Sequence, residues 1–330
     1  MKKILTLIVS LMLFFSCTAA GTGLAEDRPV HVVATIFPVY DWVREIAGDS
    51  ASSVEITMLL DSGVDLHSYQ PTAQDILTIS TADLFIYVGG ESDKWVGDVL
   101  ASAMNPNLRV VNLMEALGED IKAEEIVEGM EHEHEEDHDE DHEEGHDHEH
   151  EKEMDEHVWL SLRNAQKLVN AIAVALSQID PAHAENYGGN AAAYSEKLAA
   201  LDRQYQETVE NAAVKTVLFG DRFPFRYLTD DYGLSYYAAF TGCSAETEAS
   251  FETIVFLAEK MDELGLKTVL KLDNTDGRIA ETIIQTSQSK DQQIIAMNSM
   301  QTVTAQDVEN GVRYLTIMEE NLEALQEALR

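Results

Sequence analysis

The residues best suited to chemistry in this sequence are histidines, and eight of the eleven lie between positions 131 and 157. Nearly every residue between them is Asp or Glu. Imidazole and carboxylate groups both ligate divalent metals, and imidazole suits zinc, copper and nickel. The tract has no apolar periodicity, so it is predicted to be a solvated loop. Its composition favours metal binding over a purely acidic spacer, because a spacer needs charge but has no need of imidazole.

The charge of the chain narrows the range of partners. The 330 residues carry a formal net charge of −38, and residues 131–156, with sixteen acidic groups and one Lys, contribute −15 of it. The remaining −23 is spread over sequence that is rich enough in apolar residues to fold as two ordinary domains. Nucleic acid is excluded as a partner, since its binding requires a basic patch. An acidic protein of this kind fits a cationic cargo.

The first residues predict export. Two lysines precede the apolar run 4–15, which is too short to span a bilayer as a mature helix and is typical of a signal peptide. Cys17 follows at a position that resembles a bacterial lipobox, so we expect a cell-surface lipoprotein anchored to the membrane at Cys17, with 1–27 as signal and tether. Cleavage near Ala25 is the alternative. In either case Cys243 has no disulfide partner.

Short apolar runs alternate with amphipathic stretches and predict an α/β fold with parallel sheets. The fold expected is two parallel-sheet α/β lobes, 28–181 and 214–330, joined by one long rigid helix over 182–213, with a disordered loop at 118–156 in the first lobe. The predicted strands are 30–36, 54–60, 84–88 and 109–113 in the first lobe and 214–219, 234–240, 268–272 and 293–297 in the second. The chain is predicted to close with one amphipathic helix over 305–329.

Five residues that can ligate a metal follow these strands. His67 lies after the second strand, His157 beyond the fourth, Asp221 after the fifth, Cys243 just past the sixth and Asp273 after the seventh. Ligands bind at the carboxyl ends of parallel strands. All five side chains are therefore predicted to face one cleft between the two lobes.

Three stretches carry a resemblance to a known family: 65–72 (DLHSYQPT), 82–90 (ADLFIYVGG) and 155–160 (DEHVWL). With them, nearly the whole mature chain resembles the zinc- and manganese-binding proteins of bacterial ABC importers, the cluster A-I solute-binding family. The resemblance implies two α/β lobes bridged by one long helix, with the metal between them. An acidic, histidine-rich loop before the second histidine is typical of the zinc-specific members.

The resemblance also implies a ligand set. The family binds its metal with three His and one acidic residue, or with a water or second carboxylate in place of one of them. By motif, His67 is the first His, His157 the second and Asp273 the acidic ligand. Gly220 stands where the third His is expected and has no side chain to offer.

The fourth ligand is therefore open among Cys243, Asp221, water and a histidine of the loop. A thiolate would favour zinc over manganese, because manganese prefers oxygen ligands. Cys243 is otherwise read as a small buried residue in a tight turn. Asp221 is otherwise read as a carboxylate that caps the next helix or pairs with Arg222 or Arg226.

The function that follows from the resemblance is capture of a divalent cation outside the cytoplasm and delivery to a membrane permease driven by an ATPase. Zn²⁺ is the expected ion, Mn²⁺ the alternative, and the protein is expected to be a monomer. A surface metal buffer or adhesin without a permease is a second reading. A zinc hydrolase with Asp221 or Glu246 as base is a third reading, but no enzyme is expected.

Overall fold

The described part of the chain contains two four-stranded parallel sheets. The computed structural model describes residues 28–130, 153–244 and 248–330, so Cys17, the tract 131–152 and Glu246 lie outside the described residues. The first sheet has the order β2-β1-β3-β4 and the second the order β6-β5-β7-β8, and every pairing in both is parallel. The strands are β1 (Val30–Ala34), β2 (Val54–Met58), β3 (Leu84–Tyr87), β4 (Arg109–Asn112), β5 (Thr216–Phe223), β6 (Ser235–Thr241), β7 (Thr268–Leu272) and β8 (Gln293–Met297).

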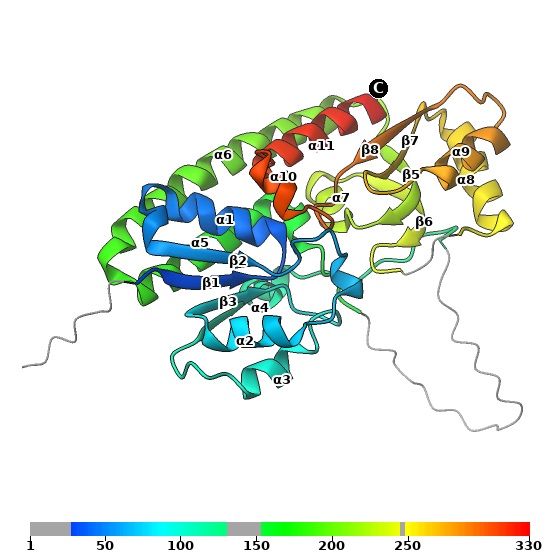
Figure 1. Cartoon of the computed structure of the whole chain (residues 1–330). Helices are drawn as coiled ribbons and strands as arrows, with labels where there is room; N and C mark the ends of the chain where they lie inside the picture. Colours follow the sequence, from blue (N-terminus) through cyan, green and yellow to red (C-terminus); the bar gives the residue numbers. More distant parts are fainter. Residues whose placement is uncertain (1–27, 131–152, 245–247) are drawn as a thin grey trace, which may run out of the picture.

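Helices flank both sheets, which confirms the prediction of two α/β lobes (Figure 1). The first lobe carries α1 (Phe37–Ala47), α2 (Ala73–Thr81), α3 (Val96–Ala101), α4 (Leu113–Leu117) and α5 (Leu162–Ile179). The second carries α7 (Arg226–Tyr232), α8 (Phe251–Leu264), α9 (Arg278–Thr286), α10 (Ala305–Glu309) and α11 (Tyr314–Ala328). In the described residues, no helix is both long enough and apolar enough to cross a membrane.

The long helix α6 (Ala184–Asn211) extends along both lobes (Figure 1). Its 28 residues correspond to about 42 Å. Near its start, Asn190 donates a hydrogen bond to the carbonyl of Ile46 at the end of α1. Near its end, the buried Tyr205 donates to the carbonyl of Met318 in α11. The helix therefore joins the first lobe to the C-terminal helix.

The prediction of a single C-terminal helix is wrong. The stretch divides into α10 and α11, and Gly311 between them has φ +99°, a backbone conformation that interrupts a right-handed helix. The break lets α11 begin against the first lobe. The backbone N–H of Tyr314 donates to the buried Asp41 of α1, and the Tyr314 hydroxyl donates to the carbonyl of Trp159.

Residues on both sides of the histidine-rich tract are structured. Ala123 and Met154 form an antiparallel bridge, flanked by hydrogen bonds from Glu124 N to Glu153 O (2.8 Å) and from Asp155 N to Lys122 O (2.9 Å). These residues lie within the range predicted as a disordered loop, 118–156. We call them, 121–124 and 153–156, the paired segment. The paired segment also contacts the second lobe, since Lys122 N donates to the Tyr227 hydroxyl.

Candidate metal centre

His67 is placed by a short turn after β2. Asp65 caps the 3₁₀ helix Leu66–Ser68, and its Oδ1 accepts a hydrogen bond from His67 N at 3.0 Å. Leu66 is 1% exposed and anchors the turn in the core. The imidazole is thus held at the carboxyl end of the first sheet, where ligands bind to parallel sheets.

His157 is fully buried at the start of the turn Val158–Leu160. The Asp155 Oδ1 atom accepts hydrogen bonds from His157 N (2.8 Å) and faces His157 Nδ1 (2.9 Å). Trp159, also fully buried, donates its indole N–H to Ser299 O at 2.9 Å. A carboxylate at Nδ1 fixes the ring so that Nε2 is free to ligate a metal.

Cys243 comes from the second lobe, in the turn after β6. Its backbone N–H donates to Glu124 Oε1 of the paired segment at 3.1 Å. A Cβ on the preceding residue, Gly242, would lie 3.0 Å from His157 Cε1 and 2.9 Å from Phe223 O. The absence of a side chain at Gly242 therefore allows this turn to approach the histidines closely.

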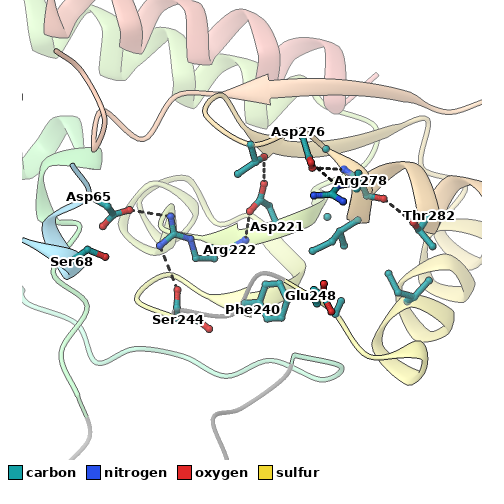
Figure 2. A pocket seen from close by; sticks show the side chains of 16 residues that line it. Asp65, Ser68, Asp221, Arg222, Phe240, Ser244, Glu248, Asp276, Arg278 and Thr282 are labelled. Carbon is teal, nitrogen blue, oxygen red and sulfur yellow. Dashed lines mark hydrogen bonds and ion pairs between the residues drawn. The ribbon is translucent and has the colours of Figure 1, made fainter. Parts of the chain in front are cut away.

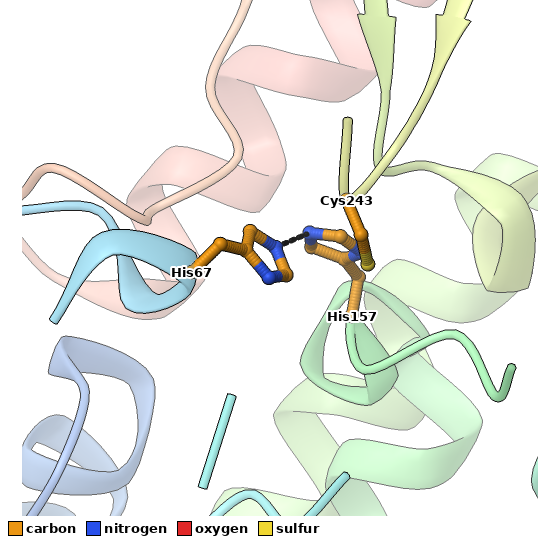
Figure 3. Close-up of side chains that lie close together, drawn as sticks. All are labelled: His67, His157 and Cys243. Atoms are coloured by element: carbon orange, nitrogen blue, oxygen red, sulfur yellow. Dashed lines mark hydrogen bonds between the residues drawn. The ribbon is translucent and has the colours of Figure 1, made fainter. Parts of the chain in front are cut away.

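The three side chains meet between the lobes (Figure 3). The ligand atoms that His67, His157 and Cys243 offer all lie within 4.8 Å of one another. Nε2 of His67 and Nε2 of His157 are 3.2 Å apart. Two nitrogens on one tetrahedral zinc are separated by about 3.3 Å, given the usual Zn–N distance. The spacing of the imidazoles therefore fits a shared ion.

Burial shifts the pKa of two of these groups, His67 and Cys243, in opposite directions. Burial, and secondly the neighbouring His157, lower the pKa of His67 to about 4, so this imidazole is neutral at neutral pH. Burial, and secondly the Glu124 carboxylate, raise the pKa of the Cys243 thiol well above its usual value. A metal ion that binds this sulfur must therefore displace its proton.

Asp221 and Asp273 are not brought into this group. Asp221 accepts hydrogen bonds from Arg222 N (2.9 Å), Leu272 N (3.2 Å) and the Thr275 hydroxyl (2.5 Å), so it ties β5 to the end of β7. Asp273 follows β7 as predicted, but it is exposed and lines a different cavity, of about 200 Å³, together with residues of α10 and α11. A ligand role for either remains a prediction.

Gly220 offers no ligand, and its surroundings leave no room for a side chain. A Cβ at this position would lie 2.6 Å from Ala280 Cα and 2.8 Å from Ala280 Cβ. The backbone of β5 is thus packed directly against α9, next to an irregularity in the β5–β6 pairing between Phe219 and Arg222. No side chain fits at residue 220, histidine included.

The sequence analysis missed the role of Arg222. Its guanidinium forms an ion pair with Asp65 across the lobes (3.0 Å) and donates to Ser244 O (3.4 Å), as Figure 2 shows. The guanidinium pairs with Asp65 and not with Asp221, the partner expected from the sequence. The same residues line a cavity of about 670 Å³ beside the metal centre. Arg222 therefore links the turn that carries His67 to the turn that carries Cys243.

Two α/β lobes on one long helix, with imidazoles from one lobe and a thiol from the other facing a single point, define a two-lobed solute-binding protein. Comparison with known families agrees: residues 32–328 match the family model ZnuA, described as zinc-uptake complex component A, periplasmic. The chain belongs to this family.

Two relatives and one solved structure that resemble this chain carry zinc in their names, and a second solved structure is described as metal-dependent. The chain is 33% identical to the zinc-binding lipoprotein AdcA of Streptococcus pneumoniae over 99% of its own length, but spans only 61% of that protein. It is 31% identical to the high-affinity zinc uptake system protein ZnuA of Bacillus subtilis, covering 94% of this chain and 90% of that one. The Zn(II)-bound ZnuA-like domain of S. pneumoniae AdcA superimposes with a TM-score of 0.69 at 28% identity, over 91% of this chain and 99% of that domain. The structure of the B. subtilis lipoprotein YcdH superimposes with a TM-score of 0.71 at 27% identity, over 91% of this chain and 99% of that one.

Proposed function

We propose that this protein is the extracytoplasmic Zn²⁺-binding component of an ABC importer, which captures the ion and delivers it to a membrane permease driven by an ATPase. The observation that carries the proposal is the convergence of His67, His157 and Cys243 on one point between the lobes. Membership in the zinc-uptake family and the names of the relatives support zinc as the cargo.

The donor set argues for zinc over manganese. Two imidazole nitrogens and a thiol are borderline and soft ligands, which suit zinc, whereas manganese favours carboxylate, carbonyl and water oxygens. Zinc takes four tetrahedral ligands, so a fourth donor completes the set. The sequence offers several candidates for this fourth donor: water, Asp221, Asp273 and a histidine of the tract 131–152.

The ion would join the two lobes. His67 and His157 belong to the first lobe and Cys243 to the second, so bound zinc holds both at once. The Arg222–Asp65 ion pair across the lobes adds to the same closed arrangement. Release to a permease then requires that these contacts separate. Anchoring by a lipid at Cys17 belongs to the same proposal and is supported by the lipoprotein name of a relative.

The test is zinc titration of the purified protein against a competing chelator, with His67→Ala and His157→Ala beside the wild type. Each substitution is expected to abolish the tight site, because each removes a ligand. His183→Ala is the matched control, since His183 pairs with Asp180 near the start of α6 and is not part of the group. Unchanged tight binding in both ligand variants would refute the proposal.

Transport is tested separately in cells. Disruption of the gene is expected to impair growth in zinc-depleted medium, with recovery on addition of zinc or of the wild-type gene. The His157→Ala gene should not restore growth. Full restoration by that gene would show that delivery does not depend on His157, whereas unimpaired growth of the disrupted strain would favour a surface role without metal delivery.

A further inference from the structure

The two histidines differ in what faces the ring nitrogen that points away from the shared centre. Nδ1 of His157 faces Asp155 Oδ1 directly, at 2.9 Å. Nδ1 of His67 faces two oxygens, the Ser92 hydroxyl at 2.8 Å and Glu156 Oε2 at 3.5 Å. Which ring nitrogen carries the proton is set by these partners.

Glu156 is a buried acid whose surroundings are shaped to hold it. It is 2% exposed, and its Oε1 accepts a hydrogen bond from Ser92 N at 2.9 Å. Among the described residues, Oε2 has no hydrogen-bond partner of normal geometry. A buried carboxylate oxygen without a donor is costly, so a donor nearby is strongly favoured. Within the described ranges, the ring nitrogen that pairs with Oε2 is Nδ1 of His67, at 3.5 Å.

The loop after β3 is built around this carboxyl group. Gly90 has φ +81°, and a Cβ there would overlap the Glu156 carboxyl. Asp93 is buried and accepts from Val88 N (3.0 Å) and Gly89 N (2.9 Å), which fixes the turn that presents Ser92. The turn thus fixes the carboxyl group of Glu156 beside His67.

We propose that Glu156, together with Ser92, is a positioning residue for metal capture: it holds His67 in the tautomer protonated at Nδ1, so that the lone pair of Nε2 is free for the ion. This proposal rests on the proposed function only in taking Nε2 of His67 as the ligand atom. A carboxylate accepts hydrogen bonds and donates none, so Nδ1 must donate toward it. Partners of this kind orient metal-binding histidines and raise their basicity.

The substitution Glu156→Gln separates this role from simple packing. Glutamine has nearly the same shape, and Ser92 N–H requires an acceptor, so the amide oxygen takes the place of Oε1. The amide NH₂ then occupies the place of Oε2 and donates toward Nδ1 of His67. That arrangement favours the proton on Nε2, which is the atom needed for the metal.

The first measurement is made without metal. Nitrogen-15 NMR of the zinc-free protein, labelled at histidine and assigned with His67→Gln, reports which nitrogen of His67 is protonated. The wild type is expected to show the proton on Nδ1, and Glu156→Gln should shift the population toward Nε2. An unchanged tautomer in Glu156→Gln would overturn the proposal.

The second measurement is Zn²⁺ affinity by chelator competition. Glu156→Gln is expected to weaken binding by about 10- to 100-fold, the range typical of outer partners of metal ligands. Ser92→Ala should weaken it as well, whereas Ser92→Thr, which keeps the hydroxyl, should stay close to wild type. These two variants keep the test decisive if Glu156→Gln does not fold. Glu91→Gln is the control, because Glu91 is exposed in the same loop and pairs with Lys94.

The two proposals fail in different ways. If the wild type binds Zn²⁺ no more tightly than His157→Ala, the proposed function is wrong, and the tautomer of His67 is still read from the zinc-free protein. If the wild type binds tightly and Glu156→Gln binds equally tightly with the same tautomer, only the role of Glu156 is wrong.

Discussion

The two lobes contribute to the proposed metal centre in different ways. The first lobe supplies two histidines from motifs that are recognisable in the sequence, each with a buried carboxylate near its Nδ1 atom. The second lobe supplies Cys243, while the position expected to carry a third histidine is Gly220, pressed against α9. β5 and β6 are hydrogen-bonded neighbours, so the ends of both strands reach the same edge of the sheet. A donor absent from one strand end is therefore within reach of the loop that follows its neighbour.

The largest effect is expected in the pH dependence of stability, and it comes from a buried acid of the first lobe. Burial raises the pKa of Asp93, in the first lobe, from 3.8 to about 7. A carboxyl group whose pKa is raised on folding contributes stability that is present below about pH 4 and lost as the pH rises through about 7. The shift corresponds to up to about 4 kcal/mol. Asp93→Asn should therefore gain free energy of unfolding relative to the wild type between pH 5 and pH 8, measured by urea denaturation.

Asp98→Asn serves as the control for this experiment, because Asp98 is exposed on α3. Because this side chain is exposed, the free energy of unfolding of Asp98→Asn should stay close to that of the wild type. If the free energies of unfolding of Asp93→Asn and the wild type differ by the same amount from pH 5 to pH 8, Asp93 does not titrate in this range.

The contribution of the second lobe is tested by Cys243→Ala. Zinc affinity should fall by more than the roughly 10- to 100-fold expected for an outer partner, because a ligand is lost. Manganese affinity should change less, since thiolate is not a favoured ligand for manganese. Titration with both ions checks the ratio, and cobalt substitution checks the sulfur directly. A thiolate-to-cobalt absorption band in the wild type that persists in Cys243→Ala would contradict the assignment.

Gly220 provides a test of packing in the second lobe. Gly220→Ala should lower the free energy of unfolding by about 1–3 kcal/mol, because the added methyl group overlaps Ala280. Gly188→Ala is the matched control: no atom lies near a Cβ there and the residue is in α6, so alanine should be neutral or stabilising. Gly220→His should not improve zinc binding. Tighter binding by that variant would mean that residue 220 can hold a ligand.

The smallest effect is expected from the contact between the lobes. Arg222→Gln removes the ion pair with Asp65 and should weaken zinc binding by about tenfold, or 1.4 kcal/mol, because the turns of His67 and Cys243 lose their common partner. Arg278→Gln is the control, since Arg278 lines the same cavity but is exposed and pairs with Asp276. Equal zinc affinities of the two variants would show that Arg222 does not contribute to zinc binding.

Much of the fold was predictable because it depends on local periodicity. The eight strands were expected within a few residues of where they lie, and β7 and β8 match their predicted ranges. The C-terminal helix was not, because its break depends on the conformation of Gly311 and on the contact of Tyr314 with the first lobe. The structured part of the expected loop was likewise missed, since it is held by distant partners such as Tyr227.

The candidate site likewise has a part that the sequence predicted and a part that depends on tertiary contacts. The sequence by itself determined where the turns of His67 and His157 lie, because short-range hydrogen bonds from the backbone N–H of each histidine to Asp65 and Asp155 define them. In the second lobe it offered three strand-end residues, with Asp273 favoured by the resemblance and Cys243 and Asp221 as alternatives for a fourth ligand. Only the tertiary structure decided among their positions, because the direction of each side chain depends on how α9 packs on β5 and how the lobes meet. Those are contacts between residues far apart in the chain, which no local pattern encodes.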